Sequence, residues 1–241
     1  MTPDTIRQLF TRRRMLALSG AAVTAVVAGS SAAQVGGEVD LILVLAVDCS
    51  YSVDNREFRL QMDGIGHAFQ SKEVQRAIES GLLGKIAVTV FQWSDAENQS
   101  LSTPWTIIDG PASANAFAQK VFGIQRELAE GGTAIGAALI FAAAALTAAP
   151  FTALRKVIDV SSDGRNNRGE IVDLARDEVT ARGITINGLA ILNEWPTLDK
   201  YFENSVIGGP YHFVLVAKDY EAYKEAIYRK LLKEITGPGL S

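Results

Sequence analysis

A nearly continuous apolar run from Val39 to Val47, broken only by Asp40, constrains the fold of this chain more than any other feature. A strand that is apolar on both sides must be covered on both faces, which is typical of the centre of a parallel sheet. Five further strand-like runs lie at 86–93, 105–108, 155–160, 184–192 and 212–216. Their alternation with helical patterns predicts an α/β fold: a doubly wound, mainly parallel six-stranded sheet with helices on both faces and one antiparallel edge strand at 105–108.

The segments between these runs carry helical signals. Asp54 followed by Glu57 forms a capping-box pattern at the start of one helix, and Ser113 is suited to cap another helix over 114–122. The segment 134–148 is so apolar that we expect its helix to pack closely against the sheet. Helices are also expected at 169–182 and 219–235.

The first 33 residues have the composition of a signal peptide. Arg7 and the run Arg12-Arg13-Arg14 precede an apolar, small-residue stretch over 15–29, which is shorter than the roughly 20 apolar residues that cross a bilayer. The run 11–16 also resembles a twin-arginine signal, although Met15 departs from the usual phenylalanine. We therefore expect a bacterial protein that is periplasmic or secreted, with no membrane span after cleavage near Ala33.

Removal of residues 1–33 leaves 208 residues, which predicts a single domain over 34–241 with a core at about 39–236. The leader holds four arginines and one acid, so 19 basic and 26 acidic residues remain, a net charge of −7. Nucleic acid is an improbable partner for such an acidic chain. Because Cys49 is the one cysteine, no internal disulfide forms, and we expect this thiol to be buried beside the first strand.

Oxygen-bearing side chains gather where the predicted central strands end. Asp48, Ser50 and Ser52 alternate directly after the first strand, and Asp163 follows the strand at 155–160. Thr133 lies between them in the sequence, in a glycine-containing loop that opens a helix. In doubly wound sheets, ligands bind beyond the carboxyl ends of the strands, where the strand order reverses. A carboxylate with neutral hydroxyls suits a small hard cation such as Mg²⁺ or Mn²⁺.

In this order, the Asp-Cys-Ser-Tyr-Ser run at 48–52, Gly132-Thr133 with Gly136, and Asp163-Gly164 resemble the metal-ion-dependent adhesion site of von Willebrand factor type A domains. The resemblance covers nearly all of 39–236 and implies a strand order similar to 3-2-1-4-5-6. Longer stretches at 158–168, 183–190 and 206–210 look like an exported bacterial family of this type whose role is unassigned.

The resemblance also implies roles for these residues. The hydroxyls of Ser50, Ser52 and Thr133 would contact the metal directly, while Asp48 and Asp163 would act mostly through water. Neutral direct ligands leave a divalent ion under-neutralised, so a carboxylate from a protein partner would complete its shell. The candidate rim around the metal consists of Tyr51, Trp93, Asp95, Arg165, Asn166, Asn167 and Arg168. Trp93 has a second reading, burial beneath the loops.

We therefore expect an exported, divalent-metal-dependent protein-binding module that recognises an acidic group on its partner. An alternative is a subunit or chaperone-like adaptor of a cell-envelope complex. A metal-dependent hydrolase is less favoured, because no convincing general base accompanies Thr133. A nucleotide-binding enzyme is disfavoured too, since no G-x-G-x-x-G pattern follows the first strand.

Overall fold

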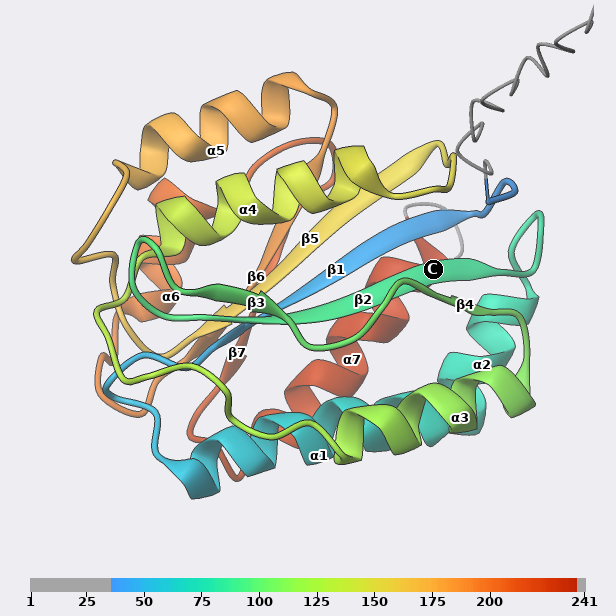
Figure 1. Ribbon diagram of the computed structural model, residues 1–241, viewed down its shortest axis with the longest axis horizontal. Helices are drawn as coiled ribbons and strands as arrows, with labels where there is room; N and C mark the ends of the chain where they lie inside the picture. Colours follow the sequence, from blue (N-terminus) through green and yellow to red (C-terminus); the bar gives the residue numbers. More distant parts are fainter. Residues whose placement is uncertain (1–35, 238–241) are drawn as a thin grey trace, which may run out of the picture. The chain divides into compact units, whose positions relative to one another are not determined.

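The computed structural model describes residues 36–237, which form a mixed β-sheet with helices on both faces (Figure 1). The expected signal peptide lies outside these residues. The strands are β1 (Leu41–Asp48), β2 (Ile86–Trp93), β3 (Gln99–Leu101), β4 (Thr106–Ile108), β5 (Arg155–Ser162), β6 (Thr185–Ile191) and β7 (Val214–Ala217). Their order is β3-β2-β1-β5-β6-β7, and β4 pairs with the first half of β2, on the same edge on which β3 pairs with its second half.

The doubly wound, mainly parallel sheet predicted from the sequence is confirmed. β2, β1, β5, β6 and β7 pair in parallel, and β4 lies antiparallel on β2 as expected. The sheet has seven strands instead of six, because β3 also pairs antiparallel with β2. β3 contains only Gln99, Ser100 and Leu101, so it has no apolar run by which the sequence could reveal it.

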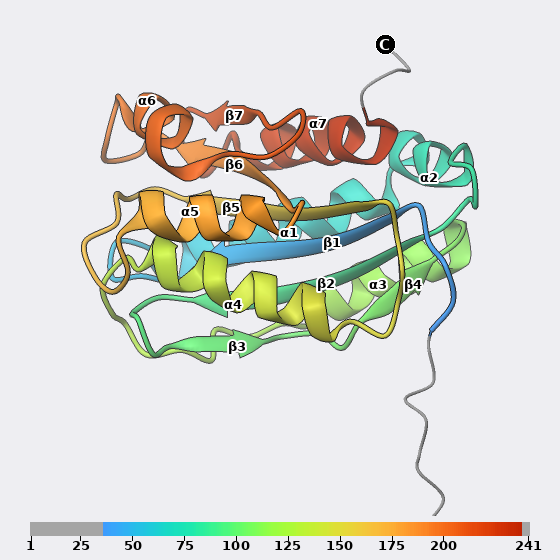
Figure 2. The ribbon, with the colours of Figure 1, turned by 90° about the horizontal axis from the view of Figure 1, so that it is seen from above.

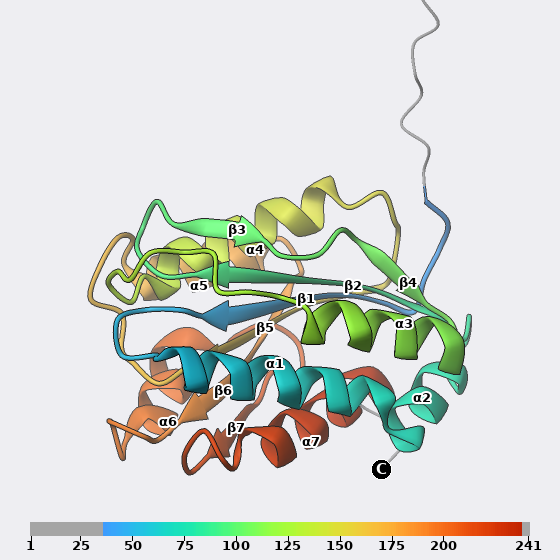
Figure 3. The same ribbon diagram turned by 60° about the horizontal axis from the view of Figure 1, so that its bottom comes forward.

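The helices form two layers, one on each face of the sheet, and Figure 3 shows one of these layers in front of the strands. One core cluster joins the sheet to α1 (Asn55–Gln70), α2 (Lys72–Glu79), α3 (Pro111–Phe122) and α7 (Tyr223–Thr236). The second cluster joins the opposite face to α4 (Ile135–Ala148), α5 (Val172–Ala181), α6 (Leu198–Tyr201) and the π-helical turn η1 (Phe202–Val206). β1 is buried along its whole length, as a strand covered on both faces must be.

Two predicted helix caps have different outcomes. Asp54 caps α1, accepting from the backbone N–H of Glu57 while the Glu57 carboxylate accepts from the N–H of Asp54. The prediction that Ser113 caps the next helix is wrong. α3 begins earlier, at Pro111 after Gly110, and the Ser113 hydroxyl donates to the Asp109 carboxylate. Proline at the first helical position needs no hydrogen-bond acceptor, which permits this earlier start.

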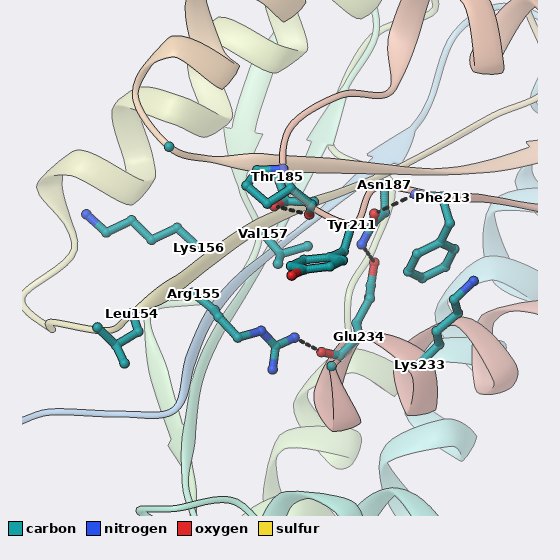
Figure 4. A pocket seen from close by; sticks show the side chains of 13 residues that line it. Leu154, Arg155, Lys156, Val157, Thr185, Asn187, Tyr211, Phe213, Lys233 and Glu234 are labelled. Atoms are coloured by element: carbon teal, nitrogen blue, oxygen red, sulfur yellow. Dashed lines mark hydrogen bonds between the residues drawn. The ribbon is translucent and has the colours of Figure 1, made fainter. Parts of the chain in front are cut away.

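A buried charge cluster fixes α7 to the sheet. The Lys230 ammonium group lies 2.6 Å from Oδ1 of Asp159 on β5 and 2.6 Å from Oε1 of Glu234. Asn187 of β6 donates to the same Glu234 oxygen at 2.9 Å. Figure 4 shows Glu234 and Asn187 at the wall of a cavity of about 250 Å³, with Arg155 beside the end of α7.

The parallel pairing brings the carboxyl ends of β1, β2 and β5 to one edge of the sheet (Figure 2). Asp48 is in register with Trp93 of β2, and Val47 with Ser161 of β5. The loops that follow β1 and β5 therefore leave the sheet side by side. Between residues 36 and 237, no helix combines the length and apolar character needed to cross a membrane.

Candidate metal centre

Three loops meet at this edge of the sheet. The first, residues 48–52, follows β1, the second contains Thr133 and opens α4, and the third begins at Asp163 after β5. Backbone bonds join them: the N–H of Tyr51 donates to Gly131 O at 2.9 Å, and the N–H of Asn167 donates to Thr133 O at 2.9 Å. The fold thus gathers all three predicted oxygen sources at one edge.

Side-chain oxygens link four of the five predicted ligands. The backbone N–H of Ser50 donates to Oδ1 of Asp48 at 2.7 Å, and the hydroxyl oxygens of Ser50 and Ser52 lie 3.3 Å apart. The Ser52 hydroxyl donates to Oδ1 of Asp163 at 2.7 Å. β1 ends at Asp48, and the chain then turns through Ser50–Val53, where the Val53 N–H donates to Ser50 O at 3.0 Å, so the turn brings the two serine hydroxyls together.

Thr133 reaches the same place from the loop before α4. A Cβ atom at Gly164 would lie 3.1 Å from Oγ1 of Thr133, so the hydroxyl faces the turn that directly follows Asp163. Any larger residue at 164 would displace it. Asn167 orients the loop by accepting from the Thr133 N–H at 2.9 Å.

The two acids are buried without a cation. Asp48 and Asp163 have no exposed surface, and no lysine or arginine among residues 36–237 forms an ion pair with either. Burial, followed by the charge of Asp163, raises the pKa of Asp48 to about 7. Burial is also the largest cause that raises the pKa of Asp163. The site therefore holds negative charge that the described part of the chain leaves uncompensated.

The donor set fits a small hard cation. Two carboxylates and three hydroxyls supply only oxygen, and Oδ2 of Asp163 is buried without a hydrogen-bond partner. Oxygen ligands of this kind are those that Mg²⁺ and Mn²⁺ accept. Among residues 36–237, no three His, Cys, Asp or Glu side chains gather in a cluster suited to a metal. Any metal at this edge would thus depend on hydroxyl ligands as much as on carboxylates.

Several residues that the sequence did not suggest contact the two acids of the site from the protein interior. The hydroxyl of Ser162 donates to Oδ2 of Asp48, and the side-chain amide of Gln61 donates to Asp48 O at 3.2 Å. The ring of Tyr220, from the turn before α7, lies close enough to Asp163 for that charge to raise the pKa of its hydroxyl, after burial itself. Ser162 directly precedes Asp163, and this adjacency was the available signal.

Arg126, in the loop between α3 and α4, holds the β1 loop by its backbone. Its guanidinium donates to Val53 O at 2.7 Å, to Cys49 O at 3.0 Å and to Ser50 O at 3.3 Å. These carbonyls flank the Ser50 and Ser52 side chains on both sides. The predicted burial of Cys49 is confirmed. No local motif marks Arg126, since its contacts span more than 70 positions.

The predicted rim divides into exposed and supporting residues. Tyr51 is 78 % exposed, and Arg165 and Arg168 are also exposed. Asn166 bonds the start of α4, accepting from the N–H of Gly136 at 3.1 Å. Asn167 is exposed and orients Thr133, as described above.

Asp95 and Trp93, at the end of β2, behave differently from each other. Asp95 accepts from the backbone N–H of Ala96 at 2.8 Å and of Gly132 at 3.3 Å, and these bonds lower its pKa. Trp93 is fully buried in the core beside α4, so the prediction that it lines the rim is wrong. β2 alternates its side chains between two covered faces, which leaves Trp93 no route to solvent.

Solved structures of similar fold include a matrix protein with a metal-ion-dependent adhesion site (MIDAS), a von Willebrand factor type A protein and a pilus adhesin. Proximal thread matrix protein 1 from the mussel byssus, with a zinc-occupied MIDAS motif, has a TM-score of 0.59 and 13% identity, over 83% of this chain and 48% of that one. A von Willebrand factor type A protein from Catenulispora acidiphila has a TM-score of 0.55 and 21% identity, over 82% and 43%. The pilus adhesin SpaC from Lactobacillus rhamnosus GG has a TM-score of 0.58 and 14% identity, over 82% and 30%.

This chain therefore spans less than half the length of each of these proteins, and the likeness establishes the fold. No curated protein matches the sequence. A family model described as "Protein of unknown function (DUF1194)" matches residues 38–239, nearly the whole described domain. The chain belongs to this DUF1194 family, and its fold resembles that of a von Willebrand factor type A protein.

Proposed function

We propose that this protein is an exported protein-binding module that uses a divalent metal, Mg²⁺ or Mn²⁺, to recognise an acidic group on its partner. The observation that carries the proposal is the pair of buried carboxylates, Asp48 and Asp163, which face hydroxyl groups and have no ion-pair partner among the described residues. Burying charge without compensation costs several kcal/mol. A cation from solution would remove this cost.

The residues of the site would have two roles in binding the metal. The hydroxyls of Ser50, Ser52 and Thr133 would hold the metal, and Asp48 and Asp163 would supply the compensating charge. The metal supplies a Lewis-acidic position for an oxygen ligand. Because the hydroxyls are neutral, this position favours a carboxylate of the partner over a neutral group. Arg126 and Ser162 would keep the ligands in place.

Two features support a binding module in the cell envelope. The arginine-rich, apolar leader at 1–33 is typical of export, and similar folds occur in a pilus adhesin and a byssal matrix protein. A fixed subunit or adaptor of an envelope complex would use the same site, and it differs from a free adhesin only in the permanence of its partner. The supporting residues include no convincing general base beside Thr133, which favours binding over hydrolysis.

The first experiment measures metal binding by the domain 34–241. Calorimetry should give binding of Mg²⁺ or Mn²⁺, and the metal should raise the melting temperature by mass action. Thr133→Ala should lose most of both effects. Thr147→Ala removes a hydroxyl at the far end of α4, bonded only to Ala143 O, and should leave them unchanged. Identical melting curves in chelator and in excess of either metal, without calorimetric binding, would refute the metal site.

The second experiment captures partners from a periplasmic extract. The captured protein should bind in Mg²⁺, leave in chelator and fail to bind the Thr133→Ala variant. Replacing the critical Asp or Glu of the partner with its amide should abolish binding. A partner that binds equally well in chelator would separate protein recognition from the metal site.

A further inference from the structure

One rim arginine is held in place without a carboxylate partner. The guanidinium carbon of Arg165 lies 5.3 Å from the ring centroid of Trp195 and 5.4 Å from that of Tyr201. Its Nη2 donates to Oγ1 of Thr197 at 3.1 Å. Cation–π contacts and one bond to a neutral hydroxyl restrict the motion of the side chain, yet leave its positive charge uncompensated.

Trp195, Thr197 and Tyr201 together form a bracket around the Arg165 side chain, and they lie far from Arg165 in the sequence. Trp195 and Thr197 belong to the loop between β6 and α6, and Tyr201 ends α6. The Tyr201 hydroxyl accepts from the backbone N–H of Asn166 at 3.3 Å, which ties the bracket to the residue next to Arg165. Trp195 remains 46 % exposed, so the bracket lies at the surface.

Of the exposed arginines of the described domain, three have carboxylate partners, and Arg76 and Arg168 have neither a carboxylate partner nor the cation–π contacts that hold Arg165. Arg56, Arg182 and Arg229 pair with Glu221, Glu178 and Glu225 at the surface. No ion pair of Arg165 occurs within residues 36–237. A guanidinium has five N–H donors, and the bond to Thr197 uses one of them. The remaining donors suit a carboxylate, which a planar guanidinium binds in bidentate fashion.

We propose that Arg165 binds a second carboxylate of the same partner whose first carboxylate completes the metal site. This inference rests on the proposed function and specifies the partner: a segment with two acidic side chains close together. Arg165 follows Asp163 by two positions, which limits the Cα separation to about 7 Å. Acids at alternate positions of an extended segment project from the same side, so we take the two acids of the partner to be next neighbours.

The test uses two blocked peptides, Gly-Asp-Gly-Asp-Gly and Gly-Asp-Gly-Asn-Gly, titrated into domain 34–241 with saturating Mg²⁺ and followed by NMR. The native protein should bind the diacid about tenfold more tightly than the monoacid, the difference that one added charge-assisted contact of about 1.4 kcal/mol gives. Arg165→Gln should reduce this preference to about twofold or less, while its affinities for Mg²⁺ and for the monoacid stay native. Arg165→Lys keeps the positive charge but loses the planar guanidinium, so its preference for the diacid should lie between those of the native protein and Arg165→Gln.

Arg182→Gln, at the end of α5 with a surface ion pair of its own, is the matched control and should keep the full preference. An equal affinity for both peptides in a native protein that binds Mg²⁺ would overturn this inference alone. A preference that survives in Arg165→Gln would also overturn it and assign the second carboxylate elsewhere. A native protein that binds no Mg²⁺ would overturn the proposed metal site, and the inference about Arg165 with it.

Discussion

Two buried charge clusters of this domain differ in where their positive charge comes from. On β5 and α7, Asp159 and Glu234 surround Lys230, whose ammonium group lies 2.6 Å from an oxygen of each. At the carboxyl ends of β1 and β5, Asp48 and Asp163 are equally buried but meet only hydroxyl groups, the Ser50 backbone N–H and each other's charge.

The difference separates a structural charge cluster from a candidate binding site. A buried carboxylate is tolerated when a cation of the chain compensates it, and the cluster then fixes one element to another. Where the chain provides oxygen ligands but no cation, the missing charge must come from protons or from solution. Burial raises the pKa of Asp48 to about 7, so a proton is one source of this missing charge.

The largest effect should follow removal of the internal cation. Lys230→Met leaves Asp159 and Glu234 buried together, and we expect a loss of about 3–5 kcal/mol in the free energy of unfolding. Urea denaturation at neutral pH measures this loss. Lys224→Met, on the exposed side of α7, is the control and should change little. A small loss in Lys230→Met would mean that both carboxyls hold protons, and it would weaken the contrast between the clusters.

The same cluster should make stability fall as pH rises. Burial, then the charge of Glu234, raises the pKa of Asp159 from 3.8 to about 8. Between these values the folded protein keeps a proton that the unfolded chain has lost, so the free energy of unfolding decreases from about pH 4 to about pH 8. We expect a slope of up to about 1.4 kcal/mol per pH unit in this range, because one proton is bound in the folded state only.

Asp159→Asn checks this assignment, since its amide oxygen can still accept from Lys230. The free energy of unfolding, measured by urea denaturation at several pH values in this range, should fall less steeply with pH in the variant than in the native protein. Parallel curves would assign the titration to other groups.

Neutralising an acid of the Asp48–Asp163 cluster should stabilise the protein, whereas removing Lys230 from the other cluster should destabilise it. Asp48→Asn keeps an acceptor for the Ser50 N–H and offers a donor to the Ser162 hydroxyl, while it removes an uncompensated charge. In chelator, we expect a gain of about 1 kcal/mol in the free energy of unfolding, together with loss of the stabilisation by Mg²⁺. Asp95→Asn should instead destabilise the protein, because backbone hydrogen bonds lower the pKa of Asp95. Loss of stability in Asp48→Asn would contradict an uncompensated site.

The smallest effect concerns the loop that carries the hydroxyls. Arg126→Gln loses donors to Cys49 O, Ser50 O and Val53 O, and we expect about threefold weaker Mg²⁺ binding by calorimetry, since the loop must then be ordered by the metal. Arg56→Gln, which breaks a surface ion pair with Glu221, should leave metal affinity unchanged. An unchanged Mg²⁺ affinity in Arg126→Gln would show that Arg126 does not order the loop for metal binding.

Features carried by local patterns were predictable. The apolar run at 86–93 has the bounds of β2, and Asp54 with Glu57 forms the capping box that its spacing indicated. Periodicity and capping depend on residues within a few positions of each other, so the sequence displays them directly. β3 escaped prediction because it depends on pairing with β2 and has no apolar pattern of its own.

The sequence by itself determined six of the seven strands, the main helices between them and the oxygen-bearing residues at the strand ends, and its resemblance to von Willebrand factor type A domains indicated the kind of fold. The tertiary structure alone decided which of these side chains meet, that Trp93 is buried, and that Arg126, Ser162 and the Trp195–Tyr201 bracket surround the site. It also decided that one acidic cluster has its own lysine and the other has none. The reason is distance along the chain: charge compensation and loop support come from residues tens of positions apart, which only the packed sheet brings into contact.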